Sequence, residues 1–125
     1  NINSYYREYH AIHQDVLNSH YSTVYNIMNY IHSNYCDDLS LNFLEKKFYI
    51  NKFYLCTLFK EVTGYSPNQY IINCRIMKAK ELLINNTSVE DVCSQTGFNN
   101  LSHFSRTFKK LIGESPKQFQ IKYRI

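Results

Sequence analysis

The chain has 125 residues, of which 44% are hydrophobic and 19% charged, and its formal net charge is +4. With only three Gly and two Pro, this composition excludes a disordered, collagen-like or loop-dominated chain and favours a helical domain. The length allows one domain of ordinary size, or two small ones that share a core, and excludes a large multidomain enzyme.

The length of the apolar runs and the start of the chain predict where the protein is located in the cell. No apolar run approaches the ~20 residues that a bilayer span requires, and the start of the chain carries no export signal. We therefore expect a soluble, cytoplasmic protein without a membrane partner. Because the chain begins with Asn1 rather than Met, we expect it to be a fragment, with residues 1–21 as a connecting segment, the tail of a missing N-terminal domain.

The first expected unit spans residues 22–66. Ser22 is predicted to cap a helix, and apolar residues recur at helical spacing along one of its sides: Val24, Ile27, Met28, Ile31 and Tyr35. A short helix over 41–47, a turn over 49–51 and a helix to Val62 are expected to follow. The last of these carries apolar residues on its inner side: Leu55, Leu58, Phe59 and Val62. Two short helices joined by a tight turn form a helix-turn-helix.

A longer helix is predicted over residues 67–85. Ser66 is suited to cap it, and Pro67 fits the first helical position, where its missing N–H does no harm. A continuous apolar stripe follows: Ile72, Ile76, Ala79 and Leu83. This helix is expected to connect two units.

The second expected unit, over residues 86–125, repeats the plan of the first. Ser88 and the acidic Asp91 are typical of a helix start, and Gly97 is typical of a helix end. A further helix over 100–112 is predicted to place four apolar side chains on one face: Leu101, Phe104, Phe108 and Leu111. Gly113 is expected to end it.

The two units share an internal repeat at an offset of 49 residues. Six residues of the first segment recur identically in the second, in a stretch of twelve positions: Phe59, Lys60, Gly64, Ser66, Pro67 and Gln69 recur as Phe108, Lys109, Gly113, Ser115, Pro116 and Gln118. The chain is therefore expected to contain two copies of one helix-turn-helix plan.

Over residues 22–121 the sequence resembles the DNA-binding domain of the AraC/XylS family of bacterial transcription regulators. The most specific stretch is in the second unit: Gly97, Phe98, Ser102, Phe104, Phe108, Lys109, Gly113, Ser115 and Pro116. The resemblance implies an all-α fold of seven helices, in which two helix-turn-helix units are joined by a central linker helix. It also implies two recognition helices that enter adjacent major grooves of double-stranded DNA.

Four positions differ from the family pattern. Glu45 stands where a small Ala is usual, and Tyr49 replaces a usual turn Gly. Cys93 occupies the Ala position of the second unit, and Gln120 replaces a common Arg. Glu45 must reach solvent or find a partner, because burying an unpaired carboxylate is costly.

By this resemblance, the base-reading positions fall on the following residues: Phe53, Cys56, Thr57, Leu101, Ser102, Ser105 and Arg106, with His103 beside them. Arg106 has the two donors that pair with guanine O6 and N7, whereas apolar side chains contact the thymine methyl. We therefore predict A/T-rich reading by the first unit.

Phosphate contacts are predicted from charge and helix starts. Residues 51–125 carry eleven basic and five acidic side chains, a balance of +6, against −2 in residues 1–50. The predicted basic contacts are Lys52, Lys60, Arg75, Lys109 and Lys110. The backbone N–H groups at the helix starts near Ser40 and Ser88 are further candidates.

Other functions have less support. No cluster of residues predicts catalysis, a cofactor or a metal site. The four cysteines, 18 to 20 residues apart, are expected to be free buried thiols. Two alternatives stay open: a protein interaction module with a basic surface, and redox-controlled DNA binding through Cys56. RNA polymerase is a possible partner, whereas an effector or a dimerisation partner would act through the missing N-terminal region.

Overall fold

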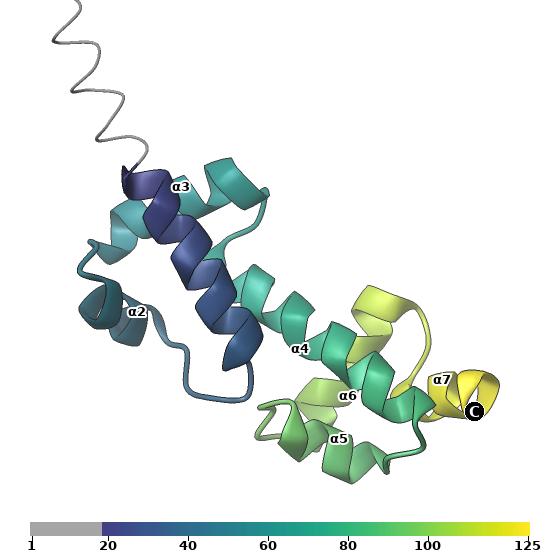
Figure 1. Ribbon diagram of the computed structural model, residues 1–125. Helices are drawn as coiled ribbons and strands as arrows, with labels where there is room; N and C mark the ends of the chain where they lie inside the picture. The colour runs from purple at the N-terminus through teal and green to yellow at the C-terminus, as the bar shows by residue number, and fades with distance from the viewer. Residues whose placement is uncertain (1–18) are drawn as a thin grey trace, which may run out of the picture.

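The computed structural model describes residues 19–125, which form seven helices and no strand. The first is helical over residues 19–33. The others, labelled in Figure 1, are α2 (Leu41–Phe48), α3 (Lys52–Thr63), α4 (Pro67–Ile84), α5 (Val89–Gln95), α6 (Leu101–Ile112) and α7 (Pro116–Tyr123). The predicted all-α, seven-helix fold is confirmed. Most of the predicted connecting segment lies outside the described residues.

The first helix begins earlier than predicted. Residues 19–22 are already helical, so Ser22 lies inside the helix and the prediction that it caps the helix is wrong. Two contacts with α3 hold this early turn: His20 Nδ1 lies 2.8 Å from the Tyr54 hydroxyl, and the Tyr21 hydroxyl donates to Glu61 over 3.5 Å. Both contacts join this turn to a distant part of the chain.

The first unit has its own apolar core. The first helix contributes Val24, Ile27 and Ile31, each with no exposed surface, and the remaining helices of the unit close over them. Their buried side chains are Leu44 from α2 and Leu55, Leu58 and Phe59 from α3. The predicted apolar faces of this unit are confirmed except at Tyr35, which lies beyond the end of the first helix, and Met28, Tyr35 and Val62 are only half-buried.

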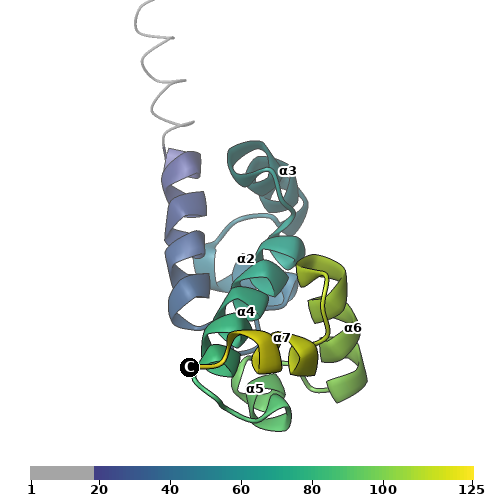
Figure 2. The same cartoon turned by 90° about the vertical axis from the view of Figure 1, so that its right-hand side faces the viewer.

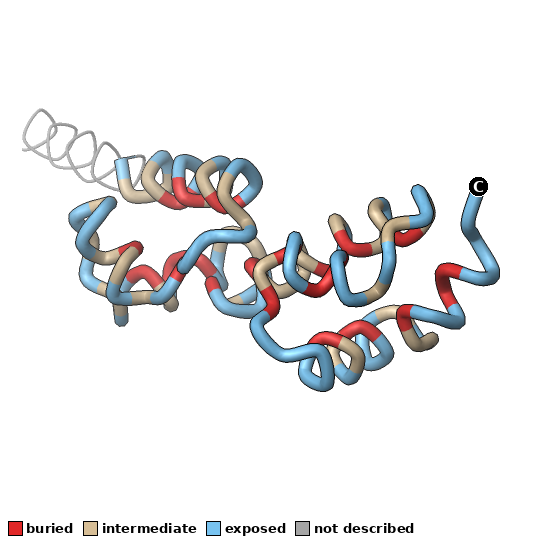
Figure 3. Tube along the Cα trace, turned by 90° about the horizontal axis from the view of Figure 1, so that it is seen from below, coloured by how far each residue is buried: buried red, intermediate tan, exposed pale blue. Residues whose placement is uncertain are grey.

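Helix α4 belongs to both cores. Ile71 packs into the first core, whereas Ile76, Ala79 and Leu83 pack into the second. The predicted stripe is buried except at Ile72, which is half-buried. In Figure 3 buried and exposed positions alternate along each helix, and α4 runs between the two groups of helices (Figure 1). Because one rigid helix supplies side chains to both cores, it connects the two units.

In the second unit, α6 buries less than its pattern predicts. Phe104 and Phe108 have no exposed surface, but Leu101 and Leu111 are 43% and 46% exposed. The prediction that all four side chains face the core is therefore wrong for Leu101 and Leu111, which lie at the two ends of the helix. The core is completed by Val92, Cys93, Phe98 and Phe119.

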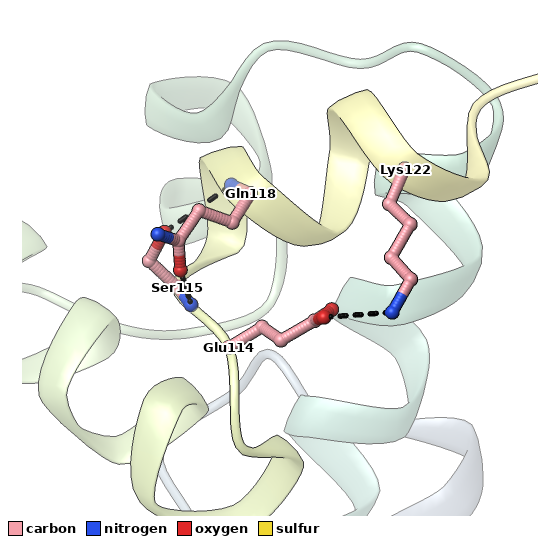
Figure 4. Close-up of polar contacts among 4 residues, drawn as sticks. All are labelled: Glu114, Ser115, Gln118 and Lys122. Carbon is pink, nitrogen blue, oxygen red and sulfur yellow. Dashed lines mark hydrogen bonds and ion pairs between the residues drawn. The ribbon is translucent and has the colours of Figure 1, made fainter.

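Helix α7 closes the second unit and has a reciprocal cap at its start. The Ser115 hydroxyl accepts from the Gln118 N–H over 3.2 Å, and Gln118 Oε1 accepts from the Ser115 N–H over 3.1 Å (Figure 4). Lys122 Nζ forms a 3.0 Å ion pair with Glu114, so both ends of this helix are tied to the loop before it. Ser66 and Gln69 form the same capping box at α4.

The four cysteines are free. Cys93 is buried, Cys56 and Cys74 are half-buried, and Cys36 is exposed, so the expectation of burial is wrong for Cys36. Burial raises the pKa of the Cys74 and Cys93 thiols above the usual value. Within residues 19–125, no three potential metal ligands gather as a cation site would require, and no helix is sufficiently long and apolar to cross a bilayer.

Candidate nucleic-acid interface

The start of α3 presents an exposed aromatic side chain. Phe53 is 73% exposed, and Thr57, one turn further along, is also exposed and donates its hydroxyl to the Phe53 carbonyl over 3.3 Å. Cys56 is half-buried. The three predicted base-reading residues of the first unit therefore lie along one helix, and Phe53 is the most accessible of them. Exposure of a large aromatic ring at a helix start is costly in water and favours a contact with a partner.

The Glu45 carboxylate, which stands at a position where Ala is usual, finds a partner by capping α3. Its Oε2 accepts from the Lys52 N–H over 2.7 Å. Asn51 Oδ1 accepts from the N–H groups of Phe53 and Tyr54. The free N–H groups of the first turn are thus satisfied by side chains, and the Glu45 charge lies at the positive end of the helix dipole.

Tyr49 completes the turn between α2 and α3. Its φ of 54° lies in the left-handed region, and its side chain is 95% exposed. Glycine adopts this conformation without the strain that a β-carbon introduces. The chain therefore keeps the turn geometry that glycine usually provides, at the cost of local strain, and it places an aromatic ring beside the start of α3.

Replacing Glu45 with alanine is expected to destabilise the fold by about 1 kcal/mol, the usual cost of removing a helix cap. The Lys52 N–H would lose its acceptor, while Asn51 would still cap Phe53 and Tyr54. Urea unfolding followed by circular dichroism measures the change. Lys46→Ala, an exposed position on the same helix, is the control and should stay within about 0.5 kcal/mol. An equal loss in both variants would contradict the capping role.

The start of α6 is more polar. Leu101, Ser102, His103 and Arg106 are exposed, whereas Ser105 is half-buried. Asn100 caps this helix by accepting from the His103 N–H over 2.9 Å. The His103 ring lies against Phe98, with 5.9 Å between the ring centroids. The predicted base-reading residues of the second unit thus share one helix face, with a guanidinium as the single permanent charge among them.

The lysines that are predicted to contact phosphates differ in their exposure and in their hydrogen bonds. Lys60, Lys109 and Lys110 are exposed. Lys52 is half-buried, and its Nζ donates to Asn42 Oδ1 over 3.0 Å and lies 5.6 Å from the centre of the Phe53 ring. The Lys52 charge is therefore held beside the start of α3.

Arg75 does not lie free on the surface, as a phosphate contact would require. Its Nε donates to the Tyr35 carbonyl over 2.7 Å, and its Nη2 donates to the Asp37 carbonyl over 2.9 Å. Burial lowers the pKa of Arg75 below its ordinary value, and nearby Cys36 and Asp38 oppose this shift. Since two of its donors already hold backbone carbonyls, we do not propose Arg75 as a phosphate contact.

Ser40 and Ser88 cap α2 and α5 with their hydroxyl groups, which accept from the N–H groups of Phe43 and Asp91. Exposed Glu90 and Asp91 lie in the first turn of α5. Because these carboxylates repel a phosphate, the start of α5 is the less favourable anion site of the two.

Helices α3 and α6 lie on the same side of the first helix. In Figure 2 both are drawn to the right of that helix, with α3 above α6 and with α4 between the first helix and α6. Two features at the start of α3 were not predicted from the sequence. One is the Glu45 cap, and the other is Tyr54, which is 39% exposed next to Phe53 and is hydrogen-bonded to His20. The unusual Glu at an Ala position was the signal for the first, whereas nothing local pointed to the second.

Comparisons with known proteins identify the family. A family model described as a helix-turn-helix domain matches residues 44–121. An uncharacterised HTH-type transcriptional regulator from Pseudoalteromonas carrageenovora is 36% identical over 97 residues, which cover 78% of this chain and 58% of that protein. The chain spans 33% and 39% of the length of two other curated relatives.

Solved structures show the same fold. A probable AraC family transcriptional regulator from Rhodopseudomonas palustris is 26% identical, with a TM-score of 0.74 over 83% of this chain and 99% of that one. The DNA-binding domain of AdpA, solved in complex with a target DNA, is 22% identical and shares the fold, with a TM-score of 0.76 over 80% of this chain and 91% of that one. The family match over most of the two units, together with the shared fold, shows that the chain belongs to the AraC-type helix-turn-helix DNA-binding domains of transcription regulators.

Proposed function

We propose that the chain provides sequence-specific binding to double-stranded DNA in a bacterial, cytoplasmic transcription regulator, with α3 and α6 as recognition helices in adjacent major grooves. The observation that carries the proposal is that α3 and α6 lie on the same side of the first helix (Figure 2), while the N-terminal halves of both carry exposed side chains suited to base edges.

The two helices are proposed to read different bases. Arg106 of α6 donates two hydrogen bonds to guanine O6 and N7, and Ser102 pairs with several base edges. Phe53, Cys56 and the methyl group of Thr57 favour thymine methyl groups. The site is therefore expected to combine an A/T-rich half under α3 with a half under α6 that contains guanine.

Phosphate contacts are proposed to supply much of the affinity. The side chains are Lys52, Lys60, Lys109 and Lys110, and the backbone N–H groups at the starts near Ser40 and Ser88 would add to them. In the longer protein, an N-terminal region would dimerise or sense an effector, and contact with RNA polymerase would link binding to transcription.

Selection of bound sequences from a random pool of duplex DNA tests the proposal. We expect an enriched asymmetric motif that spans about two helical turns, because two recognition helices in adjacent grooves lie ~34 Å apart along the DNA. The selected duplex then serves as the probe for the other binding experiments. Recovery of no motif would overturn sequence-specific reading.

Salt dependence tests the phosphate contacts. If about six phosphates are neutralised, the logarithm of the association constant should fall with the logarithm of salt concentration at a slope of about −5. Titrations of the selected duplex by fluorescence anisotropy at several KCl concentrations measure the slope. A slope close to zero would contradict an interface built on phosphates.

A further inference from the structure

Arg75 lies at the junction of the two helix-turn-helix units. It projects from α4, which supplies side chains to both cores. Its Nε and Nη2 donate to the backbone carbonyls of Tyr35 and Asp37, in the loop between the first helix and α2. The guanidinium therefore fixes this loop against the connecting helix through a pair of directional contacts.

The turn at Gly97, in the second unit, also contacts the Arg75 guanidinium. Gly97 lies in the turn between α5 and α6 and has a φ of +87°. A β-carbon placed on Gly97 would lie 3.1 Å from Arg75 Nε, 3.2 Å from Arg75 Cζ and 3.0 Å from the Cys36 backbone. The turn that precedes α6 thus packs directly against Arg75 and against the loop of the first unit.

We propose that the Arg75 and Gly97 junction sets the relative position of α3 and α6, and thereby the spacing between the two half-sites that the protein accepts on DNA. This inference rests on the proposed function. Arg75 acts as a positioning residue, which neither contacts a base nor neutralises a phosphate.

The way in which the two units are connected explains how this junction would set the relative position of α3 and α6. The extensive helix packing between the units runs through α4. The contact of Gly97 with Arg75 and with the Cys36 backbone joins the loop at 34–38 to the turn before α6, so the junction adds a second point of attachment. Lysine would keep the charge at position 75 but lose the planar fork of donors that holds two carbonyls.

The test uses the duplex that the unaltered chain selects, together with versions whose spacer between half-sites is lengthened or shortened by one and two base pairs. Changing the spacing forces DNA deformation, so the unaltered protein should prefer its own spacing by at least about fivefold. For Arg75→Lys and for Gly97→Ala we expect this preference to fall to about twofold or less, with affinity for each isolated half-site unchanged.

Two controls separate positioning from stability and from phosphate contact. Gly113→Ala introduces alanine at a φ of +95° with no atom within 4 Å of the new carbon, so it adds the same backbone strain without touching the junction. Its spacing preference should stay near that of the unaltered chain. Lys109→Ala should weaken all spacings equally. Circular dichroism and thermal unfolding establish that each variant is folded, and Arg75→Lys and Gly97→Ala each test the junction independently.

The outcomes distinguish the two proposals. A selected motif that covers only one helix pair, or no motif, would overturn the proposed function and this inference together. A two-part motif whose spacing preference survives in both Arg75→Lys and Gly97→Ala would overturn only the inference. An equal loss of spacing preference in Gly113→Ala would also overturn it, because the effect would then come from backbone strain alone.

Discussion

Replacing Arg106 with alanine is expected to weaken binding to the selected duplex by about 1–3 kcal/mol, which corresponds to roughly 5- to 150-fold. Arg106 is exposed on the outer face of α6, and its guanidinium is the side chain of the interface best suited to guanine. The loss should be confined to one base pair: when that guanine is replaced, the variant and the unaltered chain should bind with similar affinity. Anisotropy titrations over a panel of single-base variants of the duplex measure both effects.

Lys109→Ala is the matched control on the same helix. Lys109 is exposed near the end of α6, and as a phosphate contact it should weaken binding to every sequence by a similar factor and reduce the salt slope by about 1. If Arg106→Ala instead lowered affinity uniformly across the panel, Arg106 would be a phosphate contact and its base-reading role would be wrong.

Gln120→Ala is expected to lower the free energy of unfolding by about 2 kcal/mol, since the partly buried Thr87 carbonyl would lose its donor and a buried side chain would be removed. Gln120 is 4% exposed, and its Nε2 donates to the Thr87 carbonyl over 2.6 Å and to the Leu83 carbonyl over 3.2 Å. Leu83 would keep the N–H of Asn86 as a donor. Most of the loss therefore comes from Thr87 and from the space that the side chain leaves. Urea unfolding measures it.

Lys117→Ala, at an exposed position of α7, is the control for Gln120 and should change stability by less than about 0.5 kcal/mol. A Gln120→Ala protein as stable as this control would show that water replaces the amide at Thr87. The result bears on the fold of the whole second unit, because Gln120 ties α7 to the end of α4 and to the turn before α5.

Helix boundaries were predictable because the signals that define them are local. Ser66 with Gln69, and Ser115 with Gln118, cap their helices through hydrogen bonds that span three residues. The repeat at an offset of 49 residues predicted both helix pairs, since the same residues recur at the same positions of each pair. In the first helix, by contrast, Ser22 lies within the helix, and the turn that contains it contacts Tyr54 and Glu61, more than thirty residues away.

Side-chain roles that depend on distant partners were not predictable in this way. A basic residue among other basic residues predicts a phosphate contact, but it does not indicate that two backbone carbonyls from a loop about forty residues away accept hydrogen bonds from Arg75. Periodicity also predicted burial of Leu101 and Leu111, which the ends of α6 leave exposed, because a spacing rule contains no information about where the neighbouring helix stops.

By itself, the sequence determined the all-helical class, the two copies of the helix pair and the helix that joins them, since capping, periodicity and repetition are encoded in neighbouring residues. Only the tertiary structure decided that Glu45 caps α3, that Gln120 holds the turn at Thr87, and that Arg75 lies between the two units. Each of these contacts pairs a polar side chain with a backbone group that chain folding brings near. Local sequence does not record such proximity, which depends on how the helices pack.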